Sequence, residues 1–200
     1  MRRASLVILV SALQSACVSF STFQVPEPVD HGEIVLGLGA TSMVAESDFG
    51  FAPELYGRYG VAPKWDIGLK LGGVPPIGLV QADVKRLLVD GGFKLAADLG
   101  VSYTGEELEI GSGDSNTDYS FVALYPAIIA GAGAFHGGVK GIYILAGASE
   151  NEFVTGSVLG LFAGGRLGSR VQLLPEVHLY YGDDVLFTAG LGLQVPLRGR

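Results

Sequence analysis

Apolar and polar residues alternate along residues 93–103. One parity holds Phe93, Leu95, Ala97, Leu99, Val101 and Tyr103, and the other parity holds Lys94, Asp98 and Ser102. Successive side chains of an extended strand point to opposite faces, so the segment predicts a strand with one apolar face and one polar face. Its length suits the roughly 9–11 residues that a tilted strand needs to cross a bilayer.

The same alternation recurs from Glu33 onward and predicts about ten strands. They cover residues 33–45, 51–61, 65–73, 78–88, 92–104, 118–131, 138–147, 152–165, 169–182 and 184–197. Segments 118–131, 138–147 and 152–165 are apolar on both faces. We favour side chains that fill one side of an enclosed space, or a bulge at Pro126 that switches the parity. The alternative is an apolar wall that holds a lipid-like ligand.

Composition favours a membrane protein without membrane helices. The 200 residues suit one domain, and 48% are hydrophobic while only 16% are charged. Beyond the N-terminal region there is no uninterrupted apolar run of roughly 18 residues, and the 31 glycines disfavour long helices. The net charge of −7 leaves no basic patch for nucleic acid.

A soluble β-sandwich also alternates, but the positions of the aromatic residues favour a membrane wall. Aromatic residues gather near both ends of the predicted strands, as two interfacial belts require. One set is Tyr59, Trp65 and Phe93, and the other is Tyr103, Tyr119, Phe153 and Tyr181. The sequence therefore predicts an all-β fold, a transmembrane antiparallel up-and-down β-barrel of about ten strands, with eight as the alternative.

The first residues predict export. Arg2 and Arg3 precede a short apolar stretch, Ala4 to Leu13, which has the form of a signal peptide. Leu13-Gln14-Ser15-Ala16-Cys17 resembles the lipobox of bacterial lipoproteins, which implies lipidation of Cys17; cleavage after Ala12, leaving a free thiol, is the alternative. We expect a signal peptide over 1–16, a lipidated N-terminus and periplasmic linker over 17–32, and a barrel over 33–200.

Two hairpins carry a resemblance to a known class. Residues 56–69, with Tyr56-Gly57-Arg58-Tyr59 before the turn, and residues 165–177 resemble hairpins of small bacterial outer-membrane β-barrel proteins. The resemblance implies a location in the outer membrane of a Gram-negative cell and a porin-like fold. It also implies contact with the lipid bilayer and the barrel assembly machinery, although the chain ends in Pro196-Leu197-Arg198-Gly199-Arg200 and lacks the C-terminal aromatic residue common in that class.

The connections predict an orientation. If both termini are periplasmic, the periplasmic turns are 62–64, 89–91, 132–137 and 166–168. The outer loops are then 46–50, 74–77, 105–117, 148–151 and 182–184. The longest and most acidic of them, 105–117, falls in the outer set, as expected for such barrels.

Parity also predicts which polar side chains face the lumen. We expect a polar network of Glu54, Arg58, Asp66, Lys70, Asp83, Lys85, Lys94, Asp98, Glu176 and His178. No residues have the spacing of a catalytic triad, a nucleotide-binding loop or a metal site, so we expect no enzyme activity, no cofactor and no metal. The leading hypothesis is a structural or interaction barrel. The alternatives are a narrow channel or binder of small hydrophobic molecules, and a membrane-embedded lipid hydrolase that uses Glu176 and His178.

Overall fold

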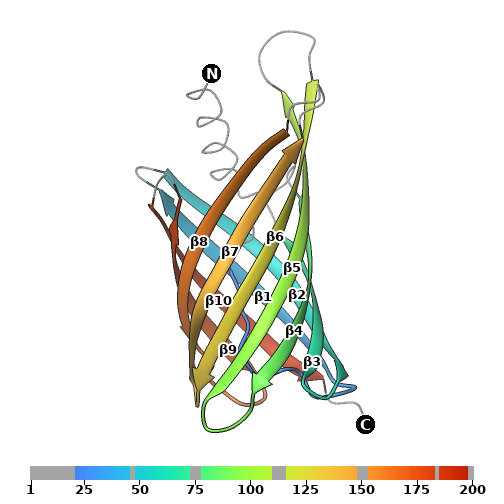
Figure 1. The fold of residues 1–200 in the computed structure, drawn as a ribbon, viewed down its shortest axis with the longest axis vertical. Coiled ribbons are helices and arrows are strands. Elements are labelled where there is room, and N and C mark those ends of the chain that lie inside the picture. Colours follow the sequence, from blue (N-terminus) through green and yellow to red (C-terminus); the bar gives the residue numbers. More distant parts are fainter. Residues whose placement is uncertain are drawn as a thin grey trace.

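A computed structural model describes residues 21–45, 48–72, 78–109, 116–147, 153–182 and 185–197. Within these ranges the chain forms one closed antiparallel sheet (Figure 1). Its strands are β1 (Ile34–Ala45), β2 (Asp48–Ala62), β3 (Trp65–Gly72), β4 (Gly78–Val89), β5 (Lys94–Glu109), β6 (Asn116–Ala132), β7 (Phe135–Gly147), β8 (Phe153–Gly165), β9 (Gln172–Tyr181) and β10 (Val185–Leu197).

Each strand pairs with its neighbours in sequence, and β1 pairs with β10 to close the ring. The closing ladder runs from Ile34 opposite Leu197 to Val44 opposite Phe187. The predicted up-and-down barrel of about ten strands is therefore confirmed. We call the end that holds the start of β1 and the end of β10 the base; it is the lower end in Figure 1.

Several predicted connections differ from the structure, and two of them differ most. The turn expected over 132–137 is shorter, because β6 continues to Ala132, β7 begins at Phe135, and Gly133 makes the turn with a φ of 61°. The loop expected over 105–117 is also shorter, because β5 and β6 stay paired as far as Glu109 opposite Asn116. Apolar alternation stops before this point, but the backbone ladder continues.

The alternation places apolar side chains outside and polar side chains inside. Along β4, every second side chain from Leu79 to Leu87 is buried and the intervening ones are exposed. Large aliphatic side chains are exposed on all of the strands. Examples in strand order are Leu38, Leu55, Leu69, Val80, Leu99, Leu124, Val139, Leu161, Val177 and Leu191. A closed sheet with this outer surface buries its exterior in hydrocarbon rather than in water.

The segment around Pro126 keeps its parity. Tyr125 is buried and Pro126 is exposed, and the pairs Leu124–Tyr143 and Ala127–Lys140 keep one register, so there is no bulge here. The inward side chains pack with those of other strands in an apolar cluster. This cluster consists of Met43, Phe121, Ala123, Tyr125, Ile142, Ile144 and Tyr180. Side chains thus fill the part of the lumen farther from the base.

Exposed aromatic side chains lie near both ends of the barrel. Tyr59, Trp65 and Phe93 are exposed near the base, and Tyr103 and Tyr181 are exposed toward the opposite end. Tyr119 and Phe153 fall outside the side chains that the structure describes. Within the described residues, no helix is long and apolar enough to cross a membrane.

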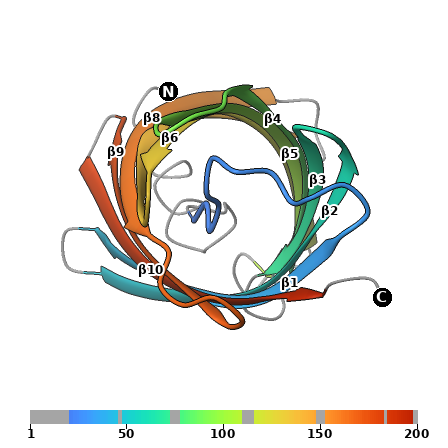
Figure 2. The same cartoon turned by 90° about the horizontal axis from the view of Figure 1, so that it is seen from below.

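The segment before β1 lies inside the barrel. Residues 17–32 were expected to form a periplasmic linker, but residues 21–30 run from the base into the lumen, as the view from below shows (Figure 2). Ser21, Thr22, Phe23 and Gln24 are all buried. We call residues 21–30 the plug.

Candidate functional site

The plug enters the lumen at the base beside β2. The amide of Gly32 donates to the carbonyl oxygen of Gly60 at 2.8 Å, and the amide of Gly60 donates to the carbonyl oxygen of Glu33 at 3.1 Å. Gly60 lets the plug pass, because a Cβ at this position would overlap the Asp30 carbonyl group. The amide of Val29 then donates to Asp66 Oδ2 at 2.8 Å. These contacts fix where the plug leaves the strand ladder.

Lysines of the wall hold the plug's carbonyl groups. The plug forms no strand, so its buried backbone groups need partners outside the ladder. Lys85 Nζ on β4 donates to the carbonyl oxygens of Val25 at 2.9 Å and Glu27 at 3.1 Å. Lys70 on β3 and Lys140 on β7 both donate to the carbonyl oxygen of Ser21, each at 3.1 Å. Charge-assisted bonds of this kind are about twice as strong as neutral ones.

Glu176 on β9 holds two amides of the plug. Its Oε2 accepts from the amide of Thr22 at 2.9 Å, and its Oε1 accepts from the amide of Gln24 at 3.2 Å. Two histidines flank the carboxylate: His178 Nε2 lies 3.1 Å from Oε2, and His136 Nε2 lies 3.5 Å from Oε1. Glu176 is thus the point where β7, β9 and the plug meet.

Phe23 anchors the plug in an aromatic seat. Its ring stacks on Tyr56 at a centroid distance of 5.7 Å, and Lys70 Nζ lies 5.5 Å from the ring centre. The seat exists because the wall beneath it is glycine. A Cβ at Gly39 would overlap the ring, and one at Gly190 or Gly192 would crowd it. Phe23 has a φ of 45°, which is a left-handed conformation. This conformation costs about 1–2 kcal/mol, and burial of the aromatic ring offsets that cost.

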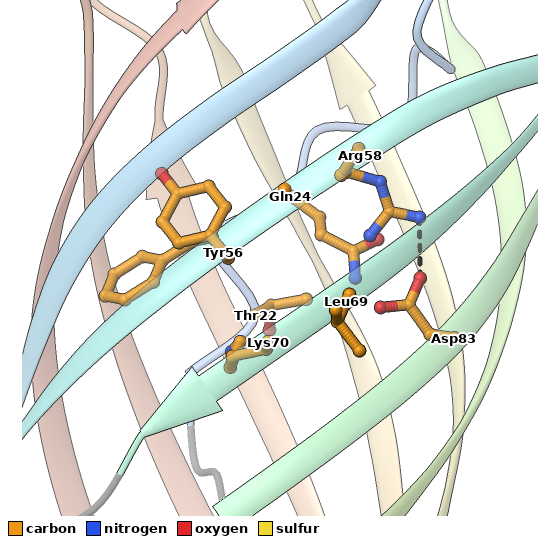
Figure 3. Close-up of a pocket in the computed structure, with 9 residues that line it drawn as sticks. Thr22, Gln24, Tyr56, Arg58, Leu69, Lys70 and Asp83 are labelled. Atoms are coloured by element: carbon orange, nitrogen blue, oxygen red, sulfur yellow. Dashed lines mark hydrogen bonds and ion pairs between the residues drawn. The ribbon is translucent and has the colours of Figure 1, made fainter.

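An ion-pair network lines β2, β3 and β4. Arg58 Nη2 lies 2.5 Å from Asp66 Oδ1 and 2.6 Å from Asp83 Oδ1, and Figure 3 shows the second of these pairs beside Thr22 and Gln24. Lys85 Nζ lies 3.3 Å from Asp66 Oδ2. Lys70 Nζ lies 3.4 Å from Glu54 Oε2, which also accepts a short hydrogen bond from the Ser21 hydroxyl. The charged side chains of the wall therefore neutralise one another.

The structure brings together most of the polar residues predicted to face the lumen. All but one are buried against the plug or against one another: Glu54, Arg58, Asp66, Lys70, Asp83, Lys85, Asp98, Glu176 and His178. Asp98 joins through its Oδ2, which accepts from Gln24 Nε2 at 3.3 Å. Lys94 lies apart, half-buried, where it is 3.4 Å from Asp90 and 4.0 Å from Glu27. Cys17 lies outside the described residues.

A small cavity lies where the plug meets β2, β3 and β4. A cavity lined by Thr22, Gln24, Tyr56, Lys70 and others has a volume of about 10 Å³, enough for about one water molecule (Figure 3). Several buried polar atoms beside the plug lack a hydrogen-bond partner, among them Gln24 Oε1, Asp98 Oδ1 and the Tyr56 hydroxyl. A water molecule in this position is what such atoms require.

The contacts of Glu176 and His178 hold the plug and each other. Glu176 and His178 form a hydrogen-bonded pair, but the carboxylate also accepts the two plug amides. The other ring nitrogen of His178, Nδ1, lies 3.2 Å from the Tyr180 hydroxyl. No group of three or more His, Cys, Asp or Glu side chains in the described part of the chain is placed to hold a metal ion.

Sequence reasoning missed three features of the site. Lys140 lies in a segment that is apolar on both faces, so its inward position carried no special signal. Tyr56 and His136 were assigned to a hairpin and a turn. A signal for a segment inside the lumen was available in the glycines of β1 and β10. Small residues on the inner face of two paired strands leave room for such a segment, and these residues are Gly37, Gly39, Gly190 and Gly192.

The closed sheet, its apolar outer surface and its charged lumen define a transmembrane β-barrel of the outer-membrane type.

No protein-family model and no curated protein matches the chain. Solved structures of similar fold include the outer membrane protease OmpT from Escherichia coli, with 10% identity over 82% of this chain and 95% of that chain and a TM-score of 0.43. The N-terminal β-barrel domain of Pseudomonas aeruginosa OprF has 11% identity over 82% and 97%, with a TM-score of 0.39. The translocator domain of the autotransporter NalP from Neisseria meningitidis has 8% identity over 97% of both chains, with a TM-score of 0.39. Similarity at this level concerns the fold and carries no argument about activity.

Proposed function

We propose that the protein is a non-enzymatic β-barrel lipoprotein of the bacterial outer membrane, closed by its own N-terminal segment, with a structural or interaction role. The observation that carries this proposal is the plug. Side chains from β3, β4, β7 and β9 bind its backbone, so the lumen is engaged in holding the chain itself.

The same contacts favour this function over the alternatives. A channel needs a continuous aqueous path through the lumen, whereas the plug lies in the lumen and is bonded to β3, β4, β7 and β9. A hydrolase that uses Glu176 and His178 needs a substrate to reach them, whereas both side chains are buried and bonded to the plug or to each other. A lumenal binder of hydrophobic molecules needs free apolar surface, whereas the apolar cluster packs against itself.

We expect the purified protein to form no ion-conducting pore. In planar bilayers, the folded protein should give no stepwise current at voltages at which a porin in the same bilayer conducts. A gel-mobility difference between heated and unheated samples checks that the barrel is folded. Regular current steps from folded protein contradict a closed barrel.

We expect the mature protein to begin with a lipidated Cys17. Intact mass spectrometry of protein from a Gram-negative host should show loss of residues 1–16 and a mass increase equal to a diacylglyceryl group plus an acyl chain. A Cys17→Ser variant is the control and should lack the added mass. A mature chain that begins at Leu13 and carries a free thiol would mean ordinary cleavage after Ala12.

A further inference from the structure

We propose that the lumen is a peptide-binding site, for which residues 21–29 are the resident ligand. In the absence of this resident, the site takes a separate peptide that has an aromatic anchor and follows the same backbone path. The inference rests on the proposed function, in which the plug closes the barrel, and deepens it by naming the class of ligand that the wall recognises.

The first argument is that the wall recognises backbone atoms. Lys85 bonds two carbonyl groups, Glu176 bonds two amides and Asp66 bonds a third amide. A peptide that bends at its aromatic residue, as the plug does at Phe23 with a φ of 45°, presents these groups at the same spacing. Some side-chain atoms of the plug make no such contact, since Thr22 Oγ1 and Gln24 Oε1 are buried without a hydrogen-bond partner, whereas the Ser21 hydroxyl bonds Glu54 and Gln24 Nε2 bonds Asp98. Bound peptides are often held in this way: main-chain hydrogen bonds supply the affinity, and many of the side chains can vary.

The second argument is that side-chain recognition is concentrated at one position. Phe23 is 1% exposed, and its ring lies between Tyr56, Lys70 and the glycines of β1 and β10. Four residues later, Glu27 lies 3.4 Å from Arg166 and 4.0 Å from Lys94 near the base. The ligand class is therefore a peptide anchored by one buried aromatic residue, and the long contacts of Glu27 add little to its recognition.

The third argument is that the wall does not need the plug to balance its charges. Arg58 pairs with Asp66 and Asp83, Lys85 pairs with Asp66, and Lys70 pairs with Glu54. If the plug were absent, these charges would stay paired, and water that enters at the base would hydrate them. The vacated site is therefore compatible with a folded barrel, which an exchangeable ligand requires.

The prolines of the resident segment stiffen its chain for binding. Pro26 and Pro28 each fix one backbone angle and lower the entropy lost on binding. Pro26 is buried against the wall, where a Cβ at Gly131 would lie 3.0 Å from its ring. A free peptide with the same prolines is similarly preorganised.

The test uses the full chain with residues 21–29 replaced by glycine and serine in equal number. A fluorescent peptide with the sequence of residues 21–30 is titrated into this variant in detergent micelles, and binding is followed by anisotropy. We expect saturable binding by the variant and at least tenfold weaker binding by the natural chain, whose site is filled. Alanine at the Phe23 position of the peptide should weaken binding about 10- to 100-fold, the effect of losing one buried aromatic side chain.

Matched glycine variants locate the site. In the glycine–serine chain, Gly39→Val should fill the aromatic seat and abolish binding of the peptide. Gly78→Val should not, because a Cβ at Gly78 meets no atom within 4 Å. If the glycine–serine chain fails the heat-mobility test, a chain from which residues 21–29 are deleted replaces it, with the same peptides.

Folded variants that fail to bind the peptide, or that bind it equally well without its phenylalanine, overturn the inference. That result does not count against the proposed function, a closed barrel, as long as the natural chain still carries no current. Current through the natural chain would instead count against the proposed function.

Discussion

Arg58→Ala is expected to destabilise the barrel by about 3–5 kcal/mol, the usual cost of breaking a buried ion pair by removing one partner. Arg58 is 7% exposed, and its guanidinium is bonded to both Asp66 and Asp83. Asp66 keeps Lys85 as a partner at 3.3 Å, but the bond that Arg58 makes to Asp83 is lost. The free energy of unfolding, measured by urea titration in lipid vesicles with gel mobility as the readout, checks this value.

Arg86→Ala is the matched control. Arg86 is exposed near the base, and its guanidinium carbon lies 5.0 Å from the centre of the Trp65 ring. Exposed contacts of this type contribute about 0.5–1 kcal/mol, so the control should change the free energy of unfolding by no more than that. Equal losses in the two variants would mean that the lumenal network does not stabilise the barrel.

Glu176→Ala is expected to release the first residues of the plug. The substitution removes the acceptor of the Thr22 and Gln24 amides and leaves His136 and His178 facing a space without a carboxylate. A buried amide without a partner costs about 1–3 kcal/mol, so hydrogen exchange at Thr22 and Gln24 should accelerate about 10- to 100-fold. Exchange measured by mass spectrometry after proteolysis, or by NMR, gives these rates.

Glu27→Ala provides the control for this second variant. Glu27 is a plug residue whose carboxylate makes only long contacts near the base, to Arg166 and Lys94. Its own carbonyl group stays bonded to Lys85. Exchange at Thr22 and Gln24 should therefore be unchanged in Glu27→Ala. Unchanged exchange in Glu176→Ala as well would show that other contacts hold the plug.

The strands were predictable from the sequence because a bilayer imposes a strict two-residue period on a barrel wall. A strand cannot leave lipid-facing positions polar, so alternation marks each segment, and parity identifies inward side chains such as Arg58 and Asp66. The period extends through β6, where apolar residues on both faces obscure it but the backbone register does not change at Pro126.

The plug was not predictable in the same way. Residues 21–30 have no period, and their partners lie far away in the sequence: Thr22 and Glu176 are 154 positions apart. A local pattern contains no information about such a contact. Lys94 lies at the edge of the network, because its parity is inward but its position at the first residue of β5 places it near the base, beside Asp90 and 4.0 Å from Glu27.

The enclosed plug has a consequence for the order of assembly. Residues 21–30 are synthesised before any of the strands that surround them, and β10, which seals the ring against β1, is synthesised last. Until that seam closes, β1 and β10 are open edges, and the sheet is free to curl. The plug contacts β3, β4, β7 and β9, so one short piece of chain gathers wall segments that are distant in sequence. We therefore expect the sheet to close around the plug during assembly, and we do not expect the plug to enter a barrel that has already closed.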